Sequence, residues 1–84
     1  MIWTVYILQC ADGSLYTGIT TDLPRRLSEH ERGAGARYTR GRGPFVIIHS
    51  ETKDTKTEAL KREKEIKGLR CSDKLKLAGG SQNG

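Results

Sequence analysis

The sequence predicts an α/β (α+β) fold: a small three-stranded antiparallel sheet flanked by helices, in the order β-β-α-β-α with a further short helix at the end. Apolar and β-branched residues form three short runs, and two longer segments carry helix start and stop signals. A chain of 84 residues suits one small core. We expect a single domain over residues 1–78 and a flexible tail over residues 79–84, which holds no core-forming residue.

The first two strands are predicted over residues 2–10 and 15–20, around the turn signal "ADG". Two registers fit this hairpin. A two-residue turn places Tyr6 and Tyr16 on opposite sheet faces. A three-residue loop, with Gly13 left-handed, sets Tyr6 opposite Gly18 and puts both tyrosines on one face.

Helix signals mark the next segments. Asp22 is a suitable N-cap and Pro24 suits a first turn, so a helix is expected from about residue 23 to about residue 32, stopped by "GAG". After the basic loop "ARYTRGRG", the run "PFVIIHS" predicts the third strand. The segment "TKTEALKREKEIKGL" predicts a second helix that begins near Thr55 or Thr57, and "SDKLKLA" a short one capped by Ser72.

The net charge of +5 favours a polyanionic partner, nucleic acid first. Two cysteines without metal-ligand spacing fit reduced thiols in a cytoplasmic protein. The sequence shows no signal peptide and no segment long enough to span a membrane, so we expect no membrane partner.

Two polar side chains fall on the apolar stripe of the first predicted helix. Leu23, Leu27 and Ala34 line this stripe, His30 falls inside it, and Arg26 lies on its edge one turn earlier. Either both side chains reach a shared pocket, or a partly buried histidine accompanies an arginine that extends to solvent.

The second predicted helix places Glu63 at the centre of its apolar face, between Ala59 and Ile66, with Leu60 beside them. A buried carboxylate is costly unless it is paired or binds a metal. Two interpretations stay open: a structural salt bridge, for example to Arg26, or a single carboxylate ligand for Mg²⁺.

The basic loop carries three arginines around one tyrosine. Arginine suits phosphate, and a tyrosine ring can stack on a base. The loop therefore indicates nucleic-acid binding through Arg37, Tyr38, Arg40 and Arg42, against the alternative of a solvated loop.

The stretches "VYIL", "YTG", "PRRLSEH" and "EALKREKEIK" together resemble the GIY-YIG nuclease superfamily, and in particular its small stand-alone bacterial members. The first motif is degenerate, so that Tyr6 stands for its tyrosine. The second motif keeps Tyr16 and Gly18. The resemblance extends over nearly the whole chain.

This resemblance implies a metal-dependent DNA endonuclease, with structure-specific cutting in repair or recombination as one expected role. It implies that Glu63 holds Mg²⁺ or Mn²⁺ and that Arg26 offsets transition-state charge. It also implies that Tyr6 acts as the general base or orients the attacking water, supported by Tyr16 or His30. A base role for Tyr6 needs Arg26 and the metal to lower its pKa; otherwise His30 is closer to the proton transfer.

The chain also departs from the family pattern. No separate DNA-binding or zinc domain is visible, and no residue matches the polar residue, often Asn, that some branches place after the metal-binding helix. The alternatives are a non-catalytic nucleic-acid-binding module or an adaptor of a larger repair complex. An RNA substrate, a protein partner and a homodimer stay open.

Overall fold

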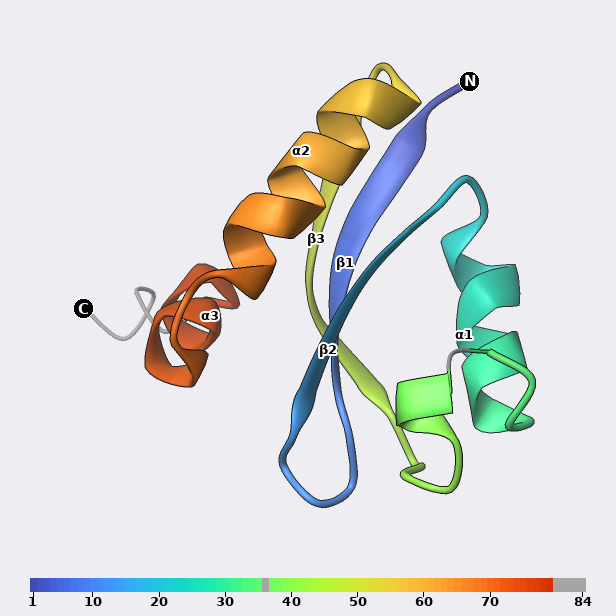
Figure 1. Cartoon of the computed structure of the whole chain (residues 1–84). Coiled ribbons are helices and arrows are strands. Elements are labelled where there is room, and N and C mark those ends of the chain that lie inside the picture. The colour runs from blue at the N-terminus through green and yellow to red at the C-terminus, as the bar shows by residue number, and fades with distance from the viewer. Residues whose placement is uncertain (36, 80–84) are drawn as a thin grey trace.

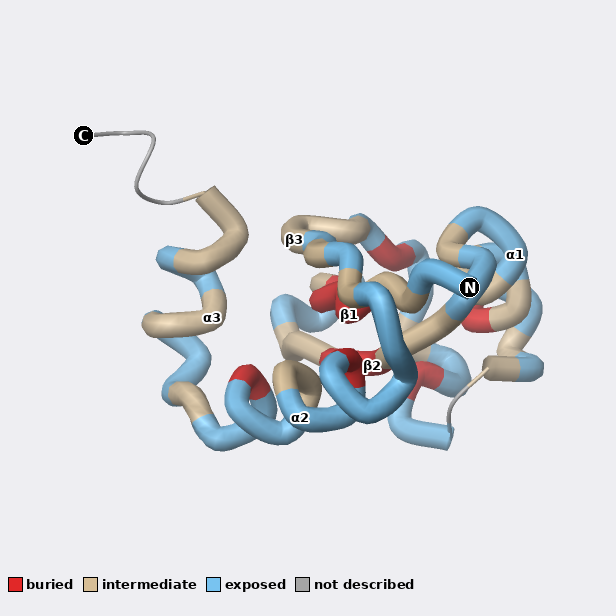
Figure 2. Tube along the Cα trace, turned by 90° about the horizontal axis from the view of Figure 1, so that it is seen from above, coloured by how far each residue is buried: buried red, intermediate tan, exposed pale blue. Residues whose placement is uncertain are grey.

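A computed structural model describes residues 1–35 and 37–79 and confirms the predicted fold class. Helix α1 lies on one side of the sheet and α2 on the other (Figures 1 and 2). Of the predicted tail, residues 80–84 lie outside the described residues. The elements in chain order are β1 (Trp3–Gln9), β2 (Leu15–Thr20), α1 (Leu23–Glu31), the 3₁₀ turn η1 (Arg37–Thr39), β3 (Val46–Lys53), α2 (Lys56–Lys67) and α3 (Cys71–Leu77).

The sheet has the order β2-β1-β3, with both pairs antiparallel, so β1 is the central strand. Its residues 5–8 are buried, and because strand side chains alternate, they supply two separate cores. Val5 and Ile7 pack with Ala59 and Ile66 of α2. The opposite face packs against α1 and the segment before β3, through Tyr6, Leu8, Cys10, Phe45, Leu23 and Leu27.

The hairpin adopts the three-residue loop. Cys10 N–H donates to the Ser14 carbonyl at 2.8 Å, and Gly13 has a φ of +87°, a left-handed conformation that favours glycine. Tyr6 therefore pairs with Gly18, and Tyr16 pairs with Leu8, which lies two residues after Tyr6 on the same face of β1. Both tyrosines consequently lie on the α1 face of the sheet.

The helix caps confirm two expectations and overturn one. Asp22 accepts from the Arg25 backbone N–H at 3.2 Å, and Thr55, rather than Thr57, accepts from that of Glu58 at 3.2 Å. The predicted Ser72 cap of the last helix is wrong. The turn from α2 is so short that α3 already begins at residue 71, which leaves Ser72 inside the first turn and the cap position without a side-chain hydrogen bond.

Three further expectations differ from the structure. Ala34 is exposed because α1 ends at residue 31, before the stripe reaches it. Leu60 is 45% exposed because only Ala59 and Ile66 of α2 are buried against the sheet. The third strand runs to Lys53 instead of ending at residue 50, because its backbone stays paired with β1 although its later side chains are polar.

A charged network fastens α2 to β3. The Arg62 guanidinium donates to both carboxylate oxygens of Glu51, at 2.9 and 3.0 Å, and His49 Nε2 lies 2.7 Å from the same carboxylate. The Arg62 hydrogen bonds are the main cause that lowers the pKa of Glu51 to about 2. The carboxylate is therefore stabilised in its charged form by the folded state.

We predict that Glu51→Gln lowers the free energy of unfolding at neutral pH by about 1–2 kcal/mol, a value reduced for solvent screening. A lowered folded-state pKa gives stability that is complete above the ordinary value of 4.5 and is lost as the pH falls toward about 2. Urea unfolding across this range measures the effect. Glu31→Gln, at an exposed position, is the control, and equal pH dependence of Glu51→Gln and the native protein would contradict the prediction.

Candidate active site

Three rings from β1, β2 and α1 meet on one face of the sheet. The Tyr6 and Tyr16 ring centroids are 6.4 Å apart. The His30 ring stands edge-on to both, at 6.0 Å from Tyr6 and 5.3 Å from Tyr16. Tyr6 and His30 are each 1% exposed, whereas Tyr16 is half-buried and borders open space. The structure thus brings together the two hairpin tyrosines and the helix histidine that the sequence singled out.

A chain of hydrogen bonds passes through His30. Its Nε2 lies 3.0 Å from the Tyr6 hydroxyl, and its Nδ1 lies 2.7 Å from the Thr39 hydroxyl in η1. Burial lowers the pKa of His30, and the nearby charge of Arg26 lowers it further. A neutral imidazole has one N–H donor and one acceptor nitrogen. His30 therefore accepts a hydrogen bond on one side and donates one on the other.

The Tyr6 hydroxyl is held in its protonated form. Burial is the main cause that raises the pKa of Tyr6 to about 12; contact with the Arg26 guanidinium lowers it, and the negative charges of Tyr16 and Glu63 raise it. Arg26 does act to lower this pKa, as a base role for Tyr6 requires, but burial outweighs the guanidinium.

Arg26 and Glu63 do not form the salt bridge that one interpretation of the sequence proposed. Arg26 lies at the rim of the site and donates to Glu29 at 3.0 Å. Glu63, whose side chain is 18% exposed, has the Lys67 ammonium 3.5 Å away, one turn further along α2. Each charge is therefore neutralised by a neighbour on its own helix.

Glu63 approaches the tyrosines from the other side of the sheet. It belongs to α2, yet its charge contributes to the raised pKa of Tyr6. Among the described residues, no three His, Cys, Asp or Glu side chains gather as a metal cage. A lone, mostly buried carboxylate fits the chemistry of Mg²⁺, which keeps most of its waters and takes few protein ligands.

Two glycines leave room for these side chains. A Cβ at Gly18 would lie 2.6 Å from the Tyr6 hydroxyl and 3.0 Å from the Tyr16 ring. A Cβ at Gly35 would lie 2.5 Å from His30 Nδ1. Gly18 is predicted from the sequence as a structural residue of the hairpin, whereas Gly35 and Thr39 are not predicted. The only signal for Gly35 was "GAG", which indicated a helix stop, and Thr39 stood unmarked in a basic loop.

The basic loop is fixed to the hairpin by two of its four predicted binding residues. Tyr38 stacks on Tyr16, with centroids 5.9 Å apart, and the Arg42 guanidinium lies 4.7 Å from the Tyr38 ring centroid. Arg42 also donates to Asp12 at 2.7 Å. The other two, Arg37 and Arg40, are exposed.

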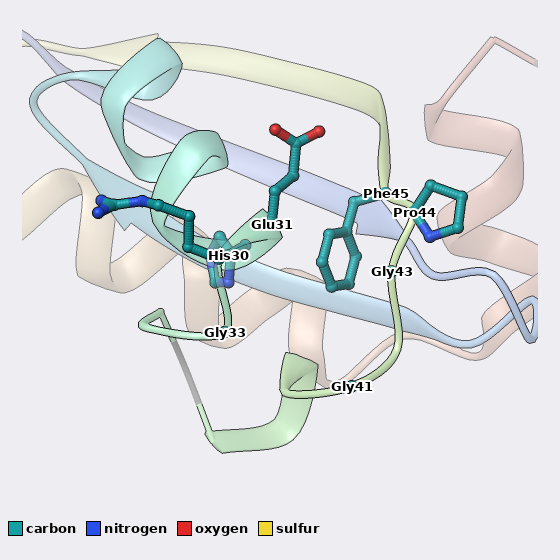
Figure 3. Close-up of a pocket in the computed structure, with 8 residues that line it drawn as sticks. His30, Glu31, Gly33, Gly41, Gly43, Pro44 and Phe45 are labelled. Carbon is teal, nitrogen blue, oxygen red and sulfur yellow. The ribbon is translucent and has the colours of Figure 1, made fainter.

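Two hollows of about 250 Å³ each flank Gly18 along the edge strand β2. One is lined by residues 19–22 and by Arg26, and the other by residues 15–17 together with side chains of η1, α2 and α3. A third cavity, of about 570 Å³, lies beside His30, where the rings of Pro44 and Phe45 face the end of α1 (Figure 3). The tyrosine pair thus sits between two open hollows on one edge of the sheet.

Comparison with known families matches residues 2–76 to the GIY-YIG catalytic domain. This chain belongs to the GIY-YIG family. It is 52% identical over 73 residues to a UPF0213 protein of Natronomonas pharaonis, covering 87% of this chain and 86% of that protein. A UPF0213 protein of Desulfotalea psychrophila is also 52% identical, over 98% of this chain and 76% of its own length.

The fold agrees with a solved relative. The solution NMR structure of a UPF0213 protein from Bacillus halodurans matches with a TM-score of 0.61 and 46% identity, over 99% of this chain and 93% of that one. UPF0213 proteins are a small stand-alone GIY-YIG family. GIY-YIG membership points to an endonuclease family with nucleic-acid substrates and a general use of divalent metals. No helix in the described part of this chain has the length and apolar character needed to cross a membrane.

We predict that Gly18→Ala destabilises the GIY-YIG fold by about 1–3 kcal/mol, because the added methyl group overlaps the buried Tyr6 hydroxyl. Thermal unfolding measures the loss, and the ring signals of Tyr6 and Tyr16 in NMR spectra report the local displacement. Gly68→Ala is the matched control, since φ is −79° there and a Cβ makes only an ordinary contact at 3.5 Å. Equal stability of the two variants would contradict the prediction.

We predict that His30 titrates below the ordinary value of 6.5, since burial and Arg26 both disfavour its charged form. As the pH falls below 6.5, this histidine takes up a proton in the unfolded chain before it does so in the folded protein. The free energy of unfolding therefore falls as the pH drops from 6.5 to the folded-state pKa. NMR titration of the imidazole signals measures this directly. His30→Gln, compared with His49→Gln, identifies which histidine causes the loss. A His30 titration above 6.5 would refute the assignment of a neutral ring.

Proposed function

We propose that this GIY-YIG protein is a metal-dependent DNA endonuclease that hydrolyses phosphodiester bonds. One observation carries the proposal: four chemically suited side chains interact with Tyr6, whose hydroxyl fills the space beside Gly18. Tyr6, Tyr16, Arg26 and His30 come from one face of the sheet. The charge of Glu63 reaches them from the other.

Glu63 is the proposed ligand of Mg²⁺ or Mn²⁺, which when bound polarises the phosphate and stabilises the leaving oxygen. Arg26 lies at the rim, beside one of the two hollows, where its guanidinium can offset charge that develops on the phosphate. Glu29 holds the guanidinium in place. Tyr16, half-buried between His30 and open space, is the proposed contact to the substrate.

The hydrogen bonds from Tyr6 through His30 to Thr39 support a proton relay. In this relay Tyr6 does not act as a preformed tyrosinate base. As Tyr6 accepts a proton from the attacking water, it passes its own proton to the nearby His30 Nε2. His30 keeps its other proton on Nδ1, bonded to Thr39. This route agrees with a Tyr6 pKa of about 12, because the phenol never needs to ionise beforehand.

The exposed Arg37 and Arg40, with the net charge of +5, support DNA as the partner. Action on flapped, branched or single-stranded DNA in repair or recombination, a cytoplasmic location, and a homodimer or protein partner are further parts of the proposal. The runner-up is a nucleic-acid-binding module without turnover.

We predict metal-dependent cutting of labelled DNA by the native chain, with single-stranded, duplex, flap and branched substrates compared in Mg²⁺, Mn²⁺ or EDTA. Arg26→Ala should reduce the rate by about 10²–10³-fold, and Glu63→Gln by at least about 10²-fold, because each removes charge stabilisation of the reacting phosphate. DNA binding in EDTA should persist in both variants.

Glu65→Gln is the matched control, because Glu65 lies on the same helix with an exposed side chain. Its rate should equal that of the native chain. DNA binding without cutting by any protein would favour the non-catalytic module, and equal cutting by native and Glu63→Gln proteins would refute the role of Glu63.

A further inference from the structure

A hollow lies at the C-terminal end of α2, and most of the residues that line it have no role in the proposed catalytic step. At about 250 Å³ it is smaller than a typical pocket for a whole ligand, roughly 300–1,000 Å³, and suits one unit of a longer chain. It borders Tyr16, the more exposed tyrosine of the proposed centre. Its lining consists of Leu15, Tyr16 and Thr17 of β2, Tyr38 of η1, Lys67 of α2 and Lys74 of α3.

The charged groups that line this hollow are both cations. Lys74 makes no ion pair with any described residue, and no carboxylate belongs to the lining. Lys67 lies at the border with the catalytic centre, with its ammonium 3.5 Å from Glu63. Two ammonium groups beside aromatic hydroxyls form a surface that is complementary to a phosphate group.

A third group supports a ligand at this place. Thr17 is 3% exposed, and its hydroxyl has no hydrogen-bond partner among the described residues. An unpaired buried hydroxyl costs about 1–3 kcal/mol. The hydroxyl is itself closed to solvent, so a phosphate or water in the hollow that Thr17 lines would supply the missing partner once the side chain turns toward it.

We propose that this hollow is a phosphate subsite for the DNA strand next to the bond that is cut. Lys74 is its resident cation. Lys67 joins it when a divalent metal binds Glu63, because the metal and the ammonium compete for the same carboxylate and the released ammonium remains beside the hollow. The proposal rests on the proposed function of Glu63, and it couples metal binding to DNA binding through one lysine.

The test measures binding of a short fluorescein-labelled single-stranded DNA by anisotropy over a series of salt concentrations, in EDTA and in Ca²⁺. Lys74→Gln should reduce the magnitude of the salt slope by about 0.7, the value for one lost phosphate contact, in both conditions. Lys67→Gln should do so only in Ca²⁺, since Glu63 holds Lys67 in EDTA. Calorimetry should show tighter Mn²⁺ binding by Lys67→Gln, which lacks the competing ammonium.

Lys64→Gln and Lys76→Gln are the matched controls, because they remove exposed lysines of α2 and α3 that do not line the hollow. Thr17→Val should raise the unfolding temperature while weakening DNA binding. Slopes for Lys67→Gln and Lys74→Gln equal to those of the controls would overturn the subsite.

The two proposals fail in different ways. If native protein cuts DNA but the four lysine variants share one slope, the subsite is wrong and the nuclease stands. If no protein cuts DNA but the slopes differ as expected, the subsite stands and the nuclease is wrong.

Discussion

Tyr6 and Gly18 occupy one rung of the hairpin ladder, and the phenol of Tyr6 fills the space that a side chain at position 18 would need. This contact depends on the three-residue loop, whose Gly13 accepts a left-handed conformation. A register slip of one residue would turn every β2 side chain to the opposite face. Tyr16 would then leave His30, and the hydrogen-bond chain from Tyr6 to Thr39 would lose the ring that packs against it.

The hydrogen-bond chain from Tyr6 to Thr39 also explains how so small a core accommodates the buried imidazole of His30. His30 is almost fully buried, yet both of its ring nitrogens have hydroxyl partners, so its neutral form is satisfied. The two charged groups of the proposed centre are placed differently. Arg26 and Glu63 lie on opposite sides of the sheet, and each has a partly exposed partner on its own helix. Ion pairs that solvent still reaches are weak, so a metal ion or a phosphate can displace these two at small cost.

The sequence predicted the strands, the helices and the presence of the hairpin because period, caps and turn residues are local signals. It also identified His30 and Glu63, because a polar residue on an apolar stripe is visible in a helical pattern. It could not choose between the hairpin registers, since both loops suit "ADG". Thr39 escaped notice because its contact with His30 depends on how an irregular loop folds back, which no periodicity encodes. The predicted Ser72 cap is wrong because only three residues connect α2 to α3. This short connection, and not the capping preference of Ser72, determines where α3 begins.

Placing the proposed centre at an edge strand has a physical consequence for the substrate. Nothing pairs with the outer side of β2 in the described sheet, so a nucleic-acid strand can approach Gly18 without displacing protein backbone. Hollows on both sides of Gly18 extend the contact beyond the reacting phosphate. Two acids beside this path, Glu29 and Glu63, each have a basic neighbour on their own helix, which reduces their repulsion of a phosphate. On the proposed role of Glu63, the charge pattern of the centre matches both the ion and the phosphate only after a metal replaces the lysine, so the proposal places metal binding before productive binding of DNA.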